Sequence, residues 1–117
     1  MNKYRNILCE MNGITFDSKK EMAKYQDLLL LQKGGEVISF SVHPRFQITD
    51  TLEKDGEKYR PRFYEADFAV TYKDGMKEII DIKPWDETKQ KFLITPLAQM
   101  KILLFDIRYP DLHLTIE

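Results

Sequence analysis

The strongest constraint on the fold is a pair of alternating apolar and polar stretches that meet at the turn sequence Lys73-Asp74-Gly75. A period of two is typical of strands with one buried face. Glycine at the end of a three-residue loop permits the left-handed conformation of a G1 bulge. The pattern predicts an antiparallel hairpin. One face would carry Tyr64, Ala66, Phe68, Val70 and Tyr72, and the other Phe63, Glu65, Asp67, Ala69 and Thr71.

The length of this loop determines which side chains lie opposite one another. A two-residue loop would put Phe68 opposite Asp81, which mixes an aromatic core residue and a carboxylate on one face. A three-residue loop instead puts Asp67 opposite Asp81, and Glu65 opposite Lys83. Directly opposed side chains have Cβ atoms about 4.5–5.5 Å apart, where like charges are destabilising. The register therefore predicts a cation between the two aspartates.

Two helices are expected on either side of the strand region. Residues 19–33 are rich in helix formers and are followed by Gly34-Gly35, the residue type preferred where a helix ends in a left-handed turn. Thr95-Pro96 is typical of an N-cap followed by proline at the first helical position. This second helix is predicted to run to about Arg108, before Tyr109-Pro110.

The remaining segments complete the predicted element order. Alternation over residues 36–49 predicts a long strand that Pro44 interrupts, because proline cannot donate to a ladder. Residues 112–116 are predicted to form a short final strand. The order helix, three-stranded meander, helix, strand predicts an α/β or α+β domain with helices covering a mixed sheet. Residues 50–57 are predicted to be a polar turn, and Pro84–Ile94 a mobile loop or an extra helical turn.

Composition limits the kinds of protein this chain can be. Its 117 residues, of which 43% are hydrophobic, are expected to form one domain over 1–117. A single cysteine excludes an internal disulfide, and the absence of a long apolar run leads us to expect a cytoplasmic protein without membrane contact. The net charge of -1 lacks the basic excess of dedicated nucleic-acid-binding proteins, although a bound divalent cation would offset part of the acidic charge.

Two strand aspartates joined by an acid from the first helix would suit Mg²⁺, which prefers hard oxygen ligands and keeps several waters. Mn²⁺ is expected to substitute for it. Phosphodiester hydrolysis requires a polarised phosphoryl oxygen, an activated water and stabilisation of negative charge. A metal at Asp67 and Asp81, with Lys83 orienting the water or neutralising charge, would supply these requirements.

Four stretches carry a family resemblance: Phe16-Asp17-Ser18-Lys19-Lys20-Glu21, His43-Pro44-Arg45-Phe46, Tyr64-Glu65-Ala66-Asp67-Phe68 and Asp81-Ile82-Lys83. They resemble a phage-encoded family of unknown function placed in the PD-(D/E)XK (restriction endonuclease-like) nuclease superfamily, over nearly the whole chain. The resemblance implies an αβββαβ core and catalytic residues Glu21, Asp67, Asp81 and Lys83, with Mg²⁺ at the two aspartates and Glu21 assisting the metal. Ala66 departs from the proline of the superfamily motif, and the segment Pro84–Ile94 is longer than the usual connection.

Each assignment has a plainer alternative. Asp81 and Lys83 could belong to a solvated strand face, and Glu21 could close a capping box with Ser18. Phosphate or base contacts are assigned to Arg45, Arg60, Arg62 and Trp85, whose alternatives are solvated surface, a charged edge strand and a partly buried anchor.

The leading hypothesis is a metal-dependent endonuclease acting on branched or structured DNA in phage replication or recombination. One rival is a non-catalytic nucleic-acid-binding module on the same fold, and another is a protein-interaction domain. A homodimer is plausible because a nuclease that cuts two strands needs two sites.

Overall fold

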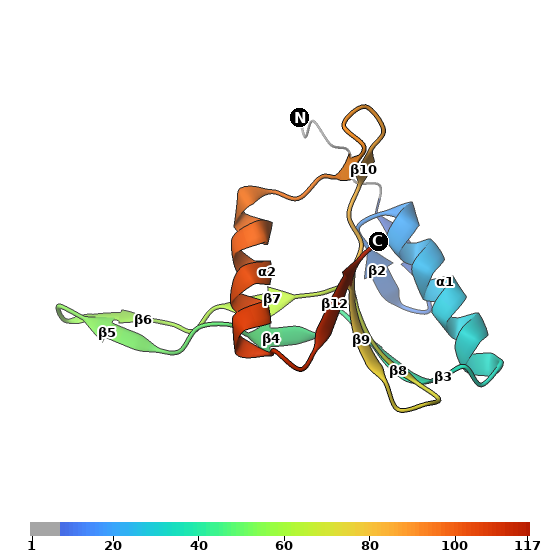
Figure 1. The fold of residues 1–117 in the computed structure, drawn as a ribbon, viewed down its shortest axis with the longest axis horizontal. Coiled ribbons are helices and arrows are strands. Elements are labelled where there is room, and N and C mark those ends of the chain that lie inside the picture. The colour runs from blue at the N-terminus through green and yellow to red at the C-terminus, as the bar shows by residue number, and fades with distance from the viewer. Residues whose placement is uncertain (1–7) are drawn as a thin grey trace.

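A four-stranded mixed sheet forms the centre of the structure, a computed structural model that describes residues 8–117 (Figure 1). The strand order is β12-β9-β8-β3. Strands β3, β8 and β9 pair in antiparallel fashion, and β12 runs parallel to β9. The predicted class, a mixed sheet flanked by helices, is confirmed. The four strands are β3 (Val37–Val42), β8 (Phe68–Tyr72), β9 (Lys77–Asp81) and β12 (His113–Ile116).

Both predicted helices are present with the expected ends. Helix α1 spans Lys19–Lys33, and helix α2 spans Pro96–Arg108. Each begins with a side-chain cap: the Ser18 hydroxyl accepts from the backbone N–H of Glu21, and the Thr95 hydroxyl accepts in the same way from Ala98. No helix within residues 8–117 is long and apolar enough to cross a membrane.

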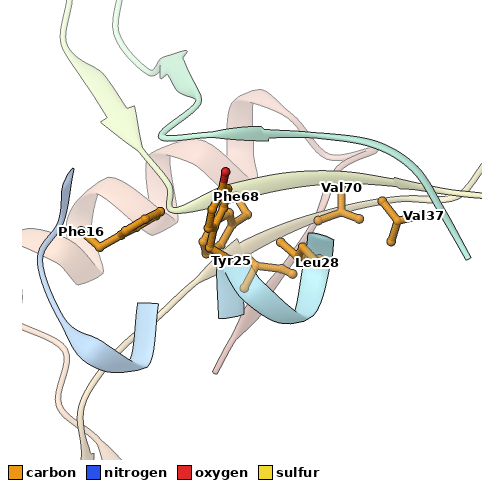
Figure 2. Packing of buried hydrophobic residues seen from close by; sticks show 7 residues of the cluster. Phe16, Tyr25, Leu28, Val37, Phe68 and Val70 are labelled. Carbon is orange, nitrogen blue, oxygen red and sulfur yellow. The ribbon is translucent and has the colours of Figure 1, made fainter. Parts of the chain in front are cut away.

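The helices enclose two separate clusters of buried side chains. Helix α1 and the strand pair β1 (Cys9–Met11) and β2 (Ile14–Phe16) cover one cluster, part of which is drawn in Figure 2. Helix α2 covers the other, on the opposite side of the sheet. The α1 cluster consists of Phe16, Tyr25, Leu28, Val37, Phe68, Val70 and Ile80, and the α2 cluster of Ile48, Tyr64, Ala66, Ile79 and Phe105.

The hairpin between β8 and β9 has the predicted three-residue loop. The backbone N–H of Tyr72 donates to the Met76 carbonyl over 2.9 Å, and Gly75 has a φ of +87°. Glycine adopts this conformation without steric cost. The register along the two strands, with Phe68 as the partner of Ile80, is the one that the loop length predicts.

A β-bulge at Asp67 and Phe68 reverses the alternation of the second strand run. The Ile80 carbonyl accepts from the Asp67 N–H over 3.0 Å, while Phe68 is the Cα partner of the same Ile80. Two residues thus face one, which shifts the side-chain pattern by one position. Ala66 accordingly packs in the α2 cluster and Phe68 in the α1 cluster. The expectation that residues 64–72 keep one apolar face was wrong.

The long strand predicted over residues 36–49 is divided at His43-Pro44, as the proline indicated. Beyond this break, β4 (Arg45–Gln47) leaves the central sheet and pairs with β7 (Phe63–Glu65). Glu65 is therefore the partner of Arg45. Its predicted position opposite Lys83 was wrong, because the bulge ends the β8 ladder before residue 65.

Two short hairpins replace segments that were expected to lack strands. The predicted polar turn is a hairpin of β5 (Leu52–Lys54) and β6 (Glu57–Tyr59), which projects past α2 on the side away from α1 (Figure 1). The segment predicted as a loop or helical turn is a hairpin of β10 (Trp85–Asp86) and β11 (Lys91–Phe92). The β1–β2 pair was also missed, although Asn12-Gly13 between its strands is a common hairpin signal.

Replacing Phe105 by alanine should destabilise the fold strongly. The Phe105 side chain is fully buried, and its ring centroid lies 5.0–5.4 Å from those of Phe46, Tyr64 and Tyr109. Removing a buried phenylalanine costs about 3–5 kcal/mol of unfolding free energy, which urea denaturation would measure. Leu103→Ala, on the exposed side of the same helix, is the control. Equal losses in the two variants would contradict the packing described here.

Candidate metal centre

Four residues predicted as catalytic meet at one end of the central sheet. Glu21 lies in the first turn of α1, Asp67 lies at the bulge, and Asp81 is the last residue of β9. Glu21 and Asp67 have carboxylate oxygens within 4.8 Å of each other, and Asp67 is hydrogen-bonded to Asp81. The Lys83 Nζ lies 3.6 Å from Oδ2 of Asp81. The tertiary structure thus joins all four side chains in a continuous set of contacts.

Glu21 is directed into this centre. The residue is 3% exposed, and its Oε1 lies 2.6 Å from Nε2 of His43. The Ser18 hydroxyl does cap the backbone N–H of Glu21 over 3.1 Å, which is one half of the capping box. The carboxylate itself points to His43, so the backbone of Glu21 serves the helix end and its side chain serves the cluster.

His43 is a member of the cluster that the sequence analysis named only within a stretch carrying the family resemblance, without a role in the site. It has a φ of +54°, a left-handed conformation in which histidine is one of the enriched non-glycine residues. Its backbone N–H donates to the Asp67 carbonyl over 2.9 Å. The following Pro44 normally keeps its predecessor extended. A left-handed residue directly before proline is thus a strained position of the kind that clusters at functional sites, and the His43-Pro44 pair at the strand break was the available signal.

Asp67 is held in an environment that favours its protonated form. Burial, the hydrogen bond with Asp81 and the negative charges of Glu21 and Asp81 raise the pKa of Asp67 to about 8. A hydrogen bond of 2.6 Å from the Ile82 N–H to Oδ2 acts in the opposite direction on this pKa. Asp67 therefore retains its proton near neutral pH, and a cation that displaces this proton would relieve the same repulsion.

Asp81 is held by two donors from its own side of the sheet. Its side chain is buried, the Tyr64 hydroxyl donates to Oδ2, and Lys83 Nζ approaches the same oxygen. Burial and the bond to Asp81 raise the pKa of Tyr64, so this hydroxyl remains protonated and acts as a donor. Sequence analysis assigned Tyr64 to the core alone. Its role here depends on the bulge, which turns it to the side where Asp81 lies.

The cluster has a donor set that can hold a divalent ion. One ligand atom from each of Glu21, His43 and Asp67 lies within 4.8 Å of the other two. Ligand atoms on one ion, with bonds of about 2.0–2.2 Å, lie at most about 4.4 Å apart. A shift of a few tenths of an ångström would bring all three into coordination. Asp81, the other predicted ligand, adjoins this set through its hydrogen bond with Asp67.

Of the predicted nucleic-acid contacts, Trp85 lies nearest to this centre in the chain, on the short hairpin that follows Lys83. Its side chain is 42% exposed and meets the ring of Phe92 edge-on at 4.9 Å. Lys20 Nζ lies 5.1 Å from the Phe92 ring centroid and donates to the Lys83 carbonyl over 2.7 Å. Through Lys20, this hairpin therefore contacts the first turn of α1, and the same lysine joins that turn to Lys83.

The predicted arginines occupy other positions. The Arg45 guanidinium lies 4.5 Å from the ring centroid of Phe63 and is exposed. Arg60 and Arg62 are exposed on the connection between β6 and β7, which leads to the projecting hairpin. The structure does not join them to the carboxylate cluster through any described contact within residues 8–117. Their contacts with nucleic acid remain predictions that the geometry of this site does not support.

The fold and the cluster define a mixed α+β domain with a carboxylate–histidine centre at one end of its sheet. The whole chain, residues 1–117, matches the family model described as "Protein of unknown function (DUF1064)", and the protein belongs to this family. Neither the curated proteins nor the solved structures gave a match.

The raised pKa of Asp67 makes the metal-free fold less stable as the pH rises. The folded chain retains this proton up to about pH 8, whereas the ordinary aspartate pKa is 3.8. The resulting stabilisation is complete below the ordinary pKa and is lost as the pH rises through about 8. In the presence of a chelator, Tm should fall by on the order of 10 °C from about pH 5 to pH 8.

Two aspartate variants test the source of this slope in thermal denaturation. Asp67→Asn should remove most of the pH dependence, because the amide does not titrate in this range. Asp27→Asn, an exposed position on α1, should keep it. A slope that is equally steep in both variants would show that Asp67 is not its cause.

Proposed function

We propose that this protein is a metal-dependent endonuclease that hydrolyses DNA phosphodiester bonds and belongs to the PD-(D/E)XK superfamily. The observation that carries the proposal is the meeting of Glu21, Asp67, Asp81 and Lys83 at one sheet end. The order of α1, the three antiparallel strands β3, β8 and β9, then α2 and the parallel β12, corresponds to the αβββαβ core expected of that superfamily.

Each side chain has a role in this proposal. When bound, Mg²⁺ or Mn²⁺ would polarise a phosphoryl oxygen and lower the pKa of a coordinated water. Asp67 and Glu21 would hold the ion, and Asp81 would complete the site beside them. Lys83, whose side chain is 22% exposed, has a cationic end that lies against Asp81 and is accessible from solvent. It would stabilise the negative charge that develops on the phosphate.

The hairpin β10–β11 supports a nucleic-acid substrate. Trp85 presents an exposed aromatic surface two residues after Lys83, and such surfaces stack on unpaired bases. Lys89 and Lys91 are exposed on the same hairpin, and Lys20 lies beside it. Asp86 and Glu87 balance the charge of Lys89 and Lys91, so the hairpin itself is neutral and Lys20 adds one positive charge beside it. The hairpin would therefore hold a single-stranded or unpaired part of branched DNA.

A second candidate function is a non-catalytic nucleic-acid-binding module on the same fold. The observation that favours it is that the acidic cluster already has protein partners. Glu21 contacts His43, Asp67 accepts from the Ile82 N–H, and Asp81 accepts from Tyr64. Such a satisfied network can be retained for the stability of the fold. DNA binding that persists without any metal ion, and without turnover, would favour this candidate.

Cleavage should depend on Asp81 and Lys83. We expect the wild type to cut at least one of linear, nicked, flapped and four-way-junction DNA in Mg²⁺ or Mn²⁺. Asp81→Asn and Lys83→Ala should each lower the cleavage rate by at least about 100-fold, the loss typical of a group that stabilises transition-state charge. Circular dichroism would verify that the variants are folded.

The controls for this assay are Asp74→Asn and Lys77→Ala. These substitutions alter exposed residues near the turn of the β8–β9 hairpin, at the end away from Asp81. Both should cleave at the wild-type rate. If no substrate is cut with either metal by folded wild-type protein, the endonuclease assignment is wrong. If cutting survives in Asp81→Asn, the proposed centre is not the active site.

Trp85→Ala should weaken binding to flapped or single-stranded DNA. Loss of one stacking partner costs about 1–3 kcal/mol per base, which corresponds to roughly five- to 150-fold in Kd. Fluorescence anisotropy in Ca²⁺ would measure binding under conditions chosen to suppress turnover. Met76→Ala, another exposed apolar residue in the turn between β8 and β9, should bind like the wild type. An unchanged affinity for DNA in Trp85→Ala would show that Trp85 does not contact the substrate.

A further inference from the structure

We infer that His43 is a direct ligand of the metal ion, together with Glu21 and Asp67, and that the centre selects a first-row transition metal such as Mn²⁺ over Mg²⁺. This inference rests on the metal centre of the proposed function but not on DNA cleavage. It changes the expected ligand set from three carboxylates to a set that includes an imidazole nitrogen.

The geometry places the imidazole where a ligand is needed. Nε2 of His43 lies 2.6 Å from Oε1 of Glu21, and one ligand atom of each of these residues lies within 4.8 Å of a carboxylate oxygen of Asp67. Glu21 is 3% exposed, so its carboxylate is directed into the protein and toward this point. Neighbouring ligands of one octahedral ion, with bonds of about 2.1 Å, lie about 3 Å apart. An ion can therefore enter with a small separation of Glu21 and His43.

The backbone holds His43 in place beside Asp67. The His43 N–H donates to the Asp67 carbonyl over 2.9 Å, and the Ala66 N–H donates to the Pro44 carbonyl over 3.0 Å. These two bonds fasten the strand break to the bulge. The ring of His43 also lies against Phe16, with centroids 6.1 Å apart. A side chain supported in this way is preorganised, which is the condition for a ligand that is not rearranged on binding.

The chemistry of the donors determines the choice of metal. Mg²⁺ prefers oxygen ligands and dehydrates reluctantly, so an imidazole nitrogen adds little to its binding. First-row transition ions accept imidazole and carboxylate together, and Mn²⁺ is the one among them most suited to carboxylates. A centre with one histidine and two acids should therefore bind Mn²⁺ more tightly than Mg²⁺.

The competing role for His43 is to orient Glu21 by a hydrogen bond without touching the ion. Replacement by glutamine separates the two roles. Its amide can still donate to Glu21 from a position close to that of Nε2, but it lacks the imidazole nitrogen. If His43 only orients Glu21, His43→Gln should retain metal preference. If His43 is a ligand, the preference should be lost.

The decisive measurement is pulsed electron paramagnetic resonance of Mn²⁺ bound to the DNA-free protein. The wild type should show hyperfine coupling from an imidazole nitrogen, and His43→Gln should lose it. The chain has only two histidines, so His113→Gln is the matched control and should keep the coupling. Titration should show a fall in Mn²⁺ affinity of at least about tenfold in His43→Gln, with much less change for Mg²⁺.

Each outcome separates this inference from the proposed nuclease. Mn²⁺ bound without imidazole coupling, or an unchanged Mn²⁺-to-Mg²⁺ affinity ratio in His43→Gln, would overturn the inference and leave the nuclease proposal standing. Hyperfine coupling from the His43 imidazole without cleavage of any DNA would support the inference and contradict the nuclease proposal. Failure to bind either ion would overturn both. If His43→Gln does not fold, His43→Asn provides a second test, because asparagine tolerates the left-handed backbone at this position.

Discussion

The β-bulge at Asp67 and Phe68 is the feature on which the rest of the structure depends. By setting two residues against Ile80, it turns Phe68 toward α1 and Ala66 toward α2, so that a single strand run supplies both core clusters. It also ends the regular ladder beside the last residue of β9. The carboxylates consequently gather at a place where the backbone changes direction and the pairing opens.

Electrostatic repulsion at this place is balanced by several partners. Three acids meet here, and burial together with the neighbouring carboxylates raises the pKa of Asp67, so that Asp67 retains a proton that reduces the repulsion. Lys83 and the Tyr64 hydroxyl stabilise Asp81, and His43 contacts Glu21. Because these partners are a proton, a lysine and hydrogen-bond donors, a divalent ion could replace part of their contribution. The electrostatic repulsion among the three carboxylates thus favours the binding of a cation between them.

Much of the fold was predictable because it depends on local chemistry. The three-residue loop at Gly75 determines the register of β8 and β9, and caps at Ser18 and Thr95 determine where the helices begin. Regular alternation, in contrast, predicted one continuous face through Tyr64 and Phe68. A bulge inserts one residue without leaving a compositional mark, so a period-two pattern cannot reveal it. The same limit caused the incorrect pairing of Glu65 with Lys83.

The sequence by itself determined the two helices, the meander and the register of its hairpin, because turn length and side-chain period act over a few residues. The predicted position of Asp67 directly opposite Asp81 was wrong, because the bulge sets Asp67 against Ile80, and the two aspartates meet through their side chains instead. Only the tertiary structure decided that Glu21 and His43 join these aspartates, that Tyr64 donates to Asp81, and that the hairpin bearing Trp85 lies against Lys20. Those contacts join segments more than fifteen residues apart. They depend on the packing of α1 against the sheet and on the bulge, and neither is encoded in a local pattern.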